Sequence, residues 1–528
     1  MRISHSCSHN LYTKADYLCY TFKQRPENQI PAKTKQNGGF ILKRKNLSGS
    51  FGNIPALLVL VLLITALFVP VSAHAATVLQ NAASNDATEN NFDSYAPVLS
   101  DTKLTLMPGK KYTLVLENAD GCSVSWKSNN TDVATVSKKG RITAIADGKT
   151  TVVATVTVPV TENKTKSYKL KCKVVVESEK EVRIAAIGDL LFHDRVIASG
   201  KKSDGTYNYD AIFSGTADYF KTFDITIANQ ETPFIDDPAK YKGYPSFGTP
   251  TALGDAMIKA GINVVTTATN HSWDQRTRGI EVTVDYWKSH KDEAIMLGMH
   301  KTEDSFQTIH YKKVNGVRIA FINFTTFLND SSGIKTYYVN ILKSNTYNEY
   351  GGYYGSLTEE KLFEKIKKAK SKADFVIVLP HWGIEYTHTP TSAQKKLAQK
   401  MADAGADAII GCHPHVVMPL KIIEASDGRR VPCYYSLGNF VSNMSQAARN
   451  LEGIAELTIT KWNGETTIKN AEFTPIINHI SGSETSYCVY LLSDYTDEMA
   501  ARHSSNYLYG KGTITVKGML DLFNSIGN

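Results

Sequence analysis

At 528 residues the chain is long enough to hold more than one domain, each with a buried core. Its formal net charge of +8 is concentrated at the N-terminus, because residues 1–50 carry nine Lys or Arg and two Asp or Glu, and residues 51–75 carry none of these. The rest of the chain is therefore nearly neutral and has no basic stripe, which argues against nucleic acid as a partner.

The first 75 residues have the layout of an export signal. A basic N-terminal segment at residues 1–53 precedes an apolar run at residues 54–75, which ends in the small-x-small cleavage site Ala73-His74-Ala75. The run is also long enough to remain as an uncleaved membrane anchor. Both alternatives predict an extracellular protein, secreted or anchored to the outer face of the cell membrane, that meets the membrane only through this segment.

Residues 76–96 are polar and weakly hydrophobic, which is typical of a flexible linker. Residues 97–177 then alternate apolar and polar side chains in short runs. Three turn signals separate these runs, at Pro108-Gly109, Lys139-Gly140 and Asp147-Gly148. The pattern predicts six or seven strands that form a small all-β sandwich.

Five cysteines follow the apolar run, an odd number without a Cys-x-x-Cys pair, so no disulfide framework is implied. Cys122 and Cys172 could pair across the all-β domain; the alternative is two buried free thiols. Cys412 lies between two candidate ligand positions in a segment expected to be extended. We therefore expect its side chain to point away from them and to pack in the core.

From residue 181 the pattern changes to alternating strands and helices, which predicts an α/β domain over residues 181–480. Helices are predicted at Tyr209–Phe223, Thr251–Ala260, Thr277–His290, Thr358–Lys372 and Thr391–Gly405, and further strands at Val317–Asn323 and Pro432–Phe440. Thr391 with Gln394 is a typical helix start. Residues 481–528 form a C-terminal extension for which the pattern suggests no role.

Side chains that could bind a metal follow five apolar strands at their carboxyl ends. They are Asp189 in VRIAAIGD, Glu231 in ITIANQE, Asn270 and His271 in INVVTTATNH, His381 in DFVIVLPHWG, and His413 and His415 in GCHPH. Loops converge at this edge of an α/β sheet, and two imidazoles two residues apart can face one small cation. The mixture of Asp, Glu, Asn and His suits a divalent ion such as Mn²⁺, Zn²⁺, Fe²⁺ or Mg²⁺.

Within residues 97–177, the segment VSWKSNNTDVATVSKKGRITAIADGKTTVVAT resembles the bacterial group 2 Ig-like repeats. The resemblance lies in its W-x-S-x-N, A-x-V and G-x-I-x-A spacings. It implies a domain without catalysis, which acts as a spacer, the interpretation we favour, or as an adhesion module at the cell surface.

Six motifs in residues 181–480 resemble, in their order, the CapA family of poly-γ-glutamate capsule proteins, within the calcineurin-like metallophosphatase superfamily. The motifs are AIGDLLFH, IANQETPF, TTATNHSWDQRTRG, LPHWGIEYTHTP, GCHPHVV and YYSLGNFV. The resemblance implies a four-layer α/β/β/α metallophosphatase-like sandwich with two divalent metal ions between the sheet edges. Carried over by position, Asp189 would bind the first ion, Glu231 would bridge, Asn270 and His381 would bind the second, and His413 and His415 would complete the pair.

This chain departs from the superfamily at two positions. The usual Asp-x-His is here Asp189-Leu-Leu-Phe-His193, so His193 either reaches the metal from the following turn or is a surface or capping residue. Glu231 stands for the bridging Asp and is one methylene longer. The family shares this replacement, so metal binding is still expected.

His271 corresponds to the superfamily's non-ligating catalytic histidine. It could donate a proton to a leaving oxygen or stabilise charge in the transition state. Asp274 could fix the tautomer of His271 or, alternatively, cap the next helix. The stretch Ser436-Leu437-Gly438-Asn439 could line the pocket wall or form a simple turn.

No GxxxxGK[ST] loop and no GxSxG motif occur, so we do not expect the ATP-dependent synthetase of the polymer. We favour a cell-surface CapA-like protein in poly-γ-glutamate capsule biosynthesis, export or anchoring, with a metal-dependent hydrolase site and capsule-synthesis membrane partners. Its substrate would be an anionic polymer. The alternatives are a surface metallophosphoesterase with another phosphorylated substrate and a non-catalytic surface binding scaffold.

Overall fold

The computed structural model describes residues 96–343, 355–507 and 514–527. The predicted basic segment at residues 1–53, the signal or anchor at residues 54–75 and nearly all of the linker lie outside these ranges. Among the described helices, none combines the length and the apolar character needed to cross a membrane.

Residues 98–176 form a small all-β domain with nine strands instead of the six or seven predicted. They are β1 (Val98–Leu99), β2 (Lys103–Leu106), β3 (Lys111–Thr113), β4 (Leu116–Glu117), β5 (Ser123–Ser128), β6 (Ala134–Val136), β7 (Arg141–Ala144), β8 (Gly148–Thr161) and β9 (Lys164–Val176). A four-stranded sheet has the order β2-β9-β8-β5 and a three-stranded sheet the order β3-β7-β6. Alternate residues of these strands are buried in one core, as expected for a sandwich.

The cysteines of this domain are free thiols. Cys172 is fully buried in the domain core, and Cys122 is half-buried. Of the two alternatives, the structure therefore has no Cys122–Cys172 disulfide.

The second domain contains two mixed sheets. The larger, of eight strands, has the order β13-β12-β11-β10-β23-β24-β25, with β22 also paired to β10, and the smaller has the order β14-β15-β18-β19-β21-β20. The strands of the larger sheet are β10 (Lys180–Leu190), β11 (Ile225–Gln230), β12 (Val264–Thr266), β13 (Ile295–Leu297), β22 (Asn439–Val441), β23 (Leu451–Trp462), β24 (Glu465–Ile480) and β25 (Tyr487–Leu491). The strands of the smaller sheet are β14 (His310–Val314), β15 (Val317–Thr325), β18 (Phe375–His381), β19 (Ala408–Ile410), β20 (Val417–Glu424) and β21 (Arg430–Leu437). Two short strands, β16 (Leu342–Lys343) and β17 (Leu357–Thr358), form a separate pair.

Helices connect these strands. They are α2 (Asp194–Ser199), α3 (Asp210–Phe213), α4 (Ala217–Phe220), α5 (Ala252–Lys259), α6 (Arg276–Ser289), α7 (Glu303–Gln307), α8 (Glu359–Lys370), α9 (Ser392–Asp403), α10 (Asp497–Ala501), α11 (Ser504–Tyr507) and α12 (Val516–Ser525), with 3₁₀ turns η3 (Pro238–Lys240), η4 (Ala447–Arg449) and η5 (Leu492–Asp494). Thr391 caps α9 in a capping box with Gln394, as predicted.

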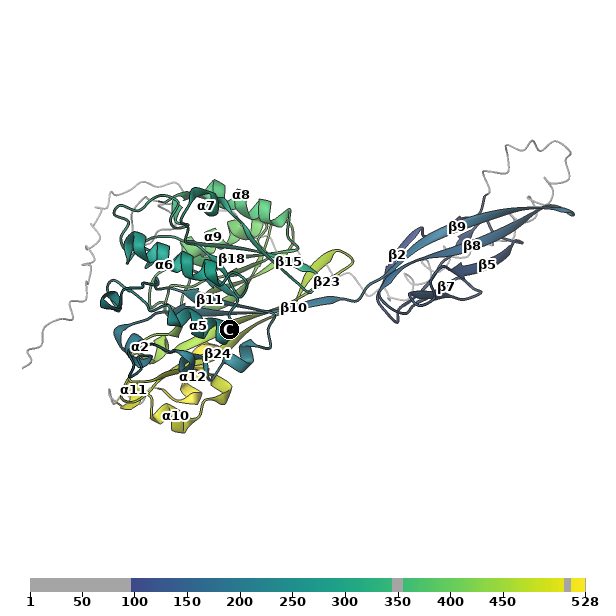
Figure 1. Cartoon of the computed structure of the whole chain (residues 1–528). Helices are drawn as coiled ribbons and strands as arrows, with labels where there is room; N and C mark the ends of the chain where they lie inside the picture. Colours follow the sequence, from purple (N-terminus) through teal and green to yellow (C-terminus); the bar gives the residue numbers. More distant parts are fainter. Residues whose placement is uncertain (1–95, 344–354, 508–513, 528) are drawn as a thin grey trace, which may run out of the picture. The chain divides into compact units, whose positions relative to one another are not determined.

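The domain has four layers. A central core of apolar side chains fills the space between the two sheets. Helices α2 to α6 cover the outer face of the larger sheet, and α8 and α9 cover the outer face of the smaller one; Figure 1 shows α8 and α9 on one side of the strands and α2 and α5 on the other. The predicted fold class is therefore confirmed: an α/β/β/α sandwich preceded by an all-β domain.

The parallel strands bring the predicted ligand positions to one edge. In the larger sheet β10 pairs with β11 so that Asp189 lies beside Asn229, and in the smaller sheet His381 at the end of β18 forms a bridge to Cys412. Every residue of β11 and β18 is buried, as expected for parallel strands covered on both faces. Rigid, buried strands thus fix where the polar loop residues begin.

Two segments differ from the sequence prediction. The helix predicted at Tyr209–Phe223 is split into α3 and α4, because the chain at Gly215 passes so close to β25 that a Cβ there would lie 2.5 Å from the carbonyl oxygen of Val489. The sheet also continues beyond residue 480, since β25 pairs with β24 and α12 contributes Met519 and Phe523 to a neighbouring core.

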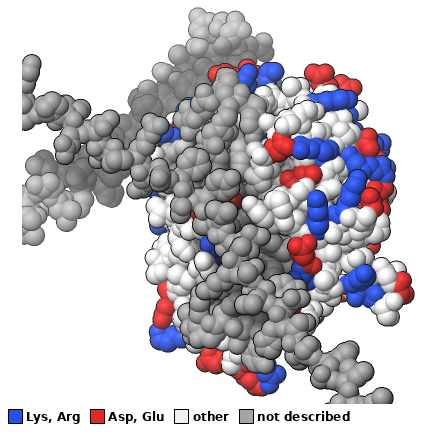
Figure 2. All heavy atoms as spheres, turned by 90° about the vertical axis from the view of Figure 1, so that its left-hand side faces the viewer, with Lys and Arg blue, Asp and Glu red and all other residues white. Residues whose placement is uncertain are grey.

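Acidic and basic side chains are interspersed on the face of the molecule seen in Figure 2, wherever described residues are visible. No patch of one sign dominates that visible part of the described surface. Recognition of a charged ligand there would therefore depend on individual side chains rather than on the electrostatic potential of a large patch of one sign.

We predict that Gly188→Ala lowers the free energy of unfolding by about 2–3 kcal/mol. A Cβ at Gly188 would lie 1.9 Å from the carbonyl oxygen of Gly438, which accepts a hydrogen bond from the Asp189 amide at 3.0 Å. Urea denaturation measures the loss. Gly428→Asn is the control, because this turn position has open space and a left-handed φ of 84° that Asn tolerates. Equal losses in the two variants would contradict the prediction.

Candidate metal centre

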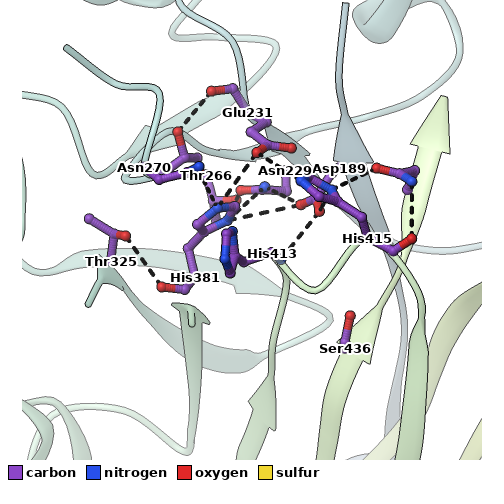
Figure 3. A network of polar contacts seen from close by, with 12 residues as sticks. Asp189, Asn229, Glu231, Thr266, Asn270, Thr325, His381, His413, His415 and Ser436 are labelled. Carbon is purple, nitrogen blue, oxygen red and sulfur yellow. Dashed lines mark hydrogen bonds and ion pairs between the residues drawn. The ribbon is translucent and has the colours of Figure 1, made fainter. Parts of the chain in front are cut away.

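The predicted ligand side chains converge at the carboxyl edge of the strands. Figure 3 shows Asp189, Glu231, Asn270, His381, His413 and His415 pointing toward a common centre from both sheets. Each of them is at most 3% exposed. The clustering that the sequence predicted is therefore present in the structure.

Two groups of candidate ligands share one carboxylate, and a third group joins Glu385 to both His413 and His415. Glu231, His381 and His413 form one group, and Asp189, Glu231 and His415 form the other. Within each group the candidate ligand atoms lie within 4.8 Å of one another. Because Glu231 belongs to both, it stands where a bridging ligand between two cations would be.

The surroundings of Glu231 fit a cation. Its side chain is fully buried, and neither carboxylate oxygen has a hydrogen-bond partner. Ring nitrogens of His415, His381 and His271 lie 3.7, 3.8 and 4.0 Å from Oε1, which is too far for a hydrogen bond. Two ligand atoms that share one ion, each about 2.0–2.2 Å from it, are about 3–4 Å apart. These gaps therefore match the span across a bound divalent ion.

The pKa shifts of the buried side chains also agree with a cation-binding site. Burial, together with the nearby Asp189 carboxylate, raises the pKa of Glu231 well above its usual value. Burial alone would lower the pKa of His415, but Glu231 and the contact with Asp189 outweigh it and raise this pKa to about 10. Burial lowers the pKa of His381 and His413 well below the usual value. Without a metal ion, a proton on His415 thus supplies positive charge next to the carboxylates.

Asp189 is oriented by neighbouring polar groups. Its Oδ1 accepts a hydrogen bond of 2.7 Å from the Asn229 side-chain amide, whose own oxygen accepts from the Thr266 hydroxyl at 2.7 Å. Its Oδ2 accepts from the His413 amide at 3.2 Å and lies 3.2 Å from Nδ1 of His415. Asn229 and Thr266 therefore support the ligand group; Asn229 lies in β11, which is next to β10, and Thr266 lies in β12, one strand further along the larger sheet.

Asn270 contacts the second group directly. Its Oδ1 lies 2.8 Å from Nε2 of His381, which donates the hydrogen bond, and its Nδ2 donates to Oδ1 of Asn329 at 3.4 Å. The side-chain oxygen of Asn270 thus lies beside a ligand atom of the Glu231–His381–His413 group, which is where the resemblance to the family placed it.

The GCHPH segment differs from the extended conformation we expected. His413 has a φ of 103° and His415 a φ of 56°, values that non-glycine residues seldom adopt. Ring nitrogens of both histidines take part in one candidate group with Glu385, and each ring also belongs to a different group that contains Glu231. Cys412 packs in the core between the sheets, as predicted. Strained backbone of this kind is held by its surroundings and is common at functional sites.

His271 lies at the edge of the cluster with Asp274 as its partner. Asp274 Oδ2 lies 2.8 Å from Nδ1 of His271 and also accepts from the Phe247 amide at 2.8 Å. Helix α6 begins at Arg276 with Gln275 as its N-cap and has no side-chain cap. Of the two alternatives for Asp274, the geometry therefore favours the partner of His271 over the helix cap.

His193 lies in the cavity wall and not in either metal group. Its Nδ1 accepts a hydrogen bond of 3.2 Å from the Asn443 amide, and its ring packs edge-on against Phe247. Burial, with the nearby His415 and His271, lowers its pKa to about 4. His193 occupies the N-cap position of α2 without a side-chain capping bond.

Two acidic side chains near the centre were not anticipated, and Asn439, for which the sequence predicted a place in the pocket wall or in a simple turn, instead contacts a candidate ligand. A carboxylate oxygen of Glu385 lies within 4.8 Å of ring nitrogens of His413 and His415. Asn439 Oδ1 accepts from Nδ1 of His415 at 2.9 Å, which leaves Nε2 facing Glu231. Glu452 is fully buried against Gly438, and burial raises its pKa well above the usual value. The WGIEY sequence after β18 was the available signal for Glu385.

A cavity of about 540 Å³ opens over the cluster. His193, His271, Asp274, Glu385, Tyr386 and His415 are among the residues that line it. A ligand in this cavity would therefore meet His415 and Glu385 of the candidate ligand groups and the His271–Asp274 pair at the same time.

We predict that binding of Mn²⁺ or Zn²⁺ at pH 7.5 releases about one proton per chain or more, and that affinity rises with pH. With a pKa of about 10, His415 is protonated in the metal-free protein, and the metal must displace this proton. Calorimetric titration in buffers of different ionisation enthalpy measures the release. A binding enthalpy that does not depend on the buffer would contradict the prediction.

Comparison with known families adds two matches. Residues 183–444 match the family described as bacterial capsule synthesis protein PGA_cap, and residues 98–168 match the bacterial Ig-like domain (group 2). A solved structure, the calcineurin-like phosphoesterase YfkN from Bacillus subtilis, is 14% identical with a TM-score of 0.32 and covers 66% of this chain and 98% of its own.

Two curated relatives match the second domain. The chain is 28% identical over 271 residues to the PGA biosynthesis protein CapA of Bacillus subtilis (strain 168) and 30% identical over 274 residues to the capsule biosynthesis protein CapA of Bacillus anthracis. These matches cover 51% and 50% of this chain but 65% and 60% of the relatives, so less than two thirds of their length is spanned. The domain at residues 183–444 thus belongs to the bacterial capsule synthesis protein PGA_cap family, and the chain also carries a group 2 bacterial Ig-like domain.

Proposed function

We propose that this chain is a capsule biosynthesis protein of the cell envelope, which acts on poly-γ-glutamate in its synthesis, export or anchoring through a centre of two divalent metal ions. The observation that carries the proposal is the buried Glu231 carboxylate, which has no hydrogen bond and is shared by two ligand groups. The family match and the names of the CapA relatives support the substrate.

The residues of the cavity have separate tasks in this proposal. Bound cations would supply positive charge for substrate oxygens and lower the pKa of a bound water. Asp189, Glu231, Asn270, His381, His413 and His415 would hold them. Asn229 and Asn439 keep Asp189 and His415 in orientation through hydrogen bonds of 2.7 and 2.9 Å.

His271 is placed to handle a proton. The carboxylate of Asp274 accepts from Nδ1 of His271, so the Nε2 atom faces the cluster, 4.0 Å from Glu231. A protonated Nε2 could donate to the group that leaves when a γ-glutamyl or phosphoester bond breaks. Asp274 stabilises the charged imidazole in this role and fixes its tautomer.

The location follows from the N-terminal segment. The apolar residues 54–75 would export the chain and be cleaved or remain as an anchor, so that the Ig-like domain and the metal domain lie at the outer face of the membrane. There the protein would meet the anionic polymer and its membrane-bound synthesis partners.

A second candidate function is a surface metallophosphoesterase with another substrate. The observation that favours it is the combination of two ligand groups with a histidine–carboxylate pair, which suits hydrolysis of a phosphoester. The third alternative, a non-catalytic scaffold, requires that substitution of His271 leaves every function of the chain intact.

We predict that the full-length protein contains about two equivalents of a divalent transition metal per chain. A variant with His413→Ala and His415→Ala should lose most of it, because one ligand is removed from each group. Inductively coupled plasma mass spectrometry measures the content. His290→Ala is the control, since this histidine stacks on Tyr286 at the end of α6 and belongs to neither group. Unchanged metal in the double variant would refute the centre.

We predict that His271→Ala slows turnover by a factor of about 10² to 10⁴ while the metal content stays unchanged. Turnover is measured on poly-γ-glutamate by the change in chain length and on a generic phosphodiester by release of its leaving group. Activity on the polymer supports the proposed function, and activity on the phosphodiester alone supports the second candidate. A variant with full activity would contradict the proton-transfer role of His271, and a parent with no activity on either substrate would leave the scaffold.

A further inference from the structure

Arg449 packs against Tyr386, one of the residues that line the cavity over the metal centre. It ends the short turn η4 (Ala447–Arg449), and its guanidinium carbon lies 3.5 Å from the ring centroid of Tyr386. Tyr386 lines the cavity, is 42% exposed and has its ring centroid 6.0 Å from that of His415. A cationic group is therefore stacked on the aromatic wall next to a candidate metal ligand.

The guanidinium of Arg449 forms no ion pair and no hydrogen bond with the described residues, and its Nε is buried without a partner. Arg276, which lines the cavity itself, is different, because it is paired with Asp330 and packs over Trp273. A buried N–H donor that has no partner costs free energy in the unliganded protein. Arg449 therefore offers donors that an incoming anion can use.

The backbone of Arg449 is tied to the metal group. Asn439 Nδ2 donates hydrogen bonds to the carbonyl oxygens of Arg449 at 3.3 Å and of His415 at 3.2 Å. The same side chain accepts from Nδ1 of His415 at 2.9 Å. Asn439 thus fixes the position of η4 relative to His415, so the guanidinium is held at a set place beside the centre.

We propose that Arg449, stacked on Tyr386, is a binding subsite for a carboxylate of a γ-glutamyl chain that lies in the cavity; this rests on the proposed function. A guanidinium binds a carboxylate through two parallel N–H···O bonds. Stacking on an aromatic ring fixes the plane in which these two N–H donors lie. Each unit of poly-γ-glutamate carries a free carboxylate beside its γ-linked backbone. The subsite would anchor one such unit while the next γ-amide bond lies over the metal groups.

The test uses the full-length protein loaded with Mn²⁺ and a γ-linked glutamate oligomer with a fluorescent end group. Binding is followed by fluorescence anisotropy. Arg449→Met keeps an aliphatic side chain and removes the guanidinium with its N–H donors. We expect this variant to bind the oligomer about 10-fold more weakly or worse. Arg449→Lys should lose part of this affinity, because it keeps the charge but not the paired donors.

Two controls isolate the interaction. Arg502→Met removes an exposed arginine that is paired with Glu498 on α10 and lies outside the cavity lining, so it should bind as the parent does. A second oligomer, with its carboxylates converted to carboxamides, should bind more weakly to the parent and be insensitive to Arg449→Met. Metal content, measured in each variant, should stay unchanged.

The outcomes separate the subsite from the proposed function. If the parent binds the carboxylate oligomer and Arg449→Met binds it equally well, the subsite is refuted and the proposed function stands. If the loaded parent does not bind the oligomer at all, both are refuted. If Arg449→Met weakens competition by inorganic phosphate but not binding of the oligomer, Arg449 serves a phosphate and the carboxylate subsite is refuted.

Discussion

The structure of the second domain depends on a carboxylate that cannot be satisfied by the protein alone. Glu231 is fully buried at the end of β11, with no hydrogen bond to either oxygen, and Asp189 lies in the same fully buried cluster. Two carboxylates in the interior repel each other and lack solvation, so positive charge must be present. The surrounding imidazoles, three of them at 3.7–4.0 Å, leave room for that charge to be a metal ion.

This constraint explains several features of the fold. Strands β10, β11 and β18 are buried on both faces, so their carboxyl ends are held in fixed positions. Gly188 allows β10 to touch the chain at Gly438, and the contact holds Asp189 in place. The left-handed backbone at His413 and His415 costs free energy, which the packed surroundings must offset. Both features place ligands rather than improve packing.

Much of this could be predicted from the sequence, because apolar runs followed by Asp, Glu, Asn or His identify strand ends at one sheet edge. The α/β/β/α layers followed from the resemblance to the family. Other features could not be predicted. The split between α3 and α4 depends on a close contact with β25, which is distant in sequence. The role of Glu385 depends on a loop whose conformation the residue pattern does not specify, that of Asn439 depends on the pairing of β22 with β10, and the φ of His413 has no signal in the sequence.

The topology has a consequence for the order in which the molecule assembles. Strand β10 is central to its sheet, yet one of its neighbours, β23, comes from near the other end of the chain, and the contact of Asp189 with His413 spans 224 positions. A chain that crosses a membrane from its N-terminus would therefore deliver the first ligand long before the last. Contacts of such long range form late in folding. A metal ion bound at this site would therefore not nucleate folding, as zinc does in a zinc finger, but would be loaded only after both sheets have closed around the site.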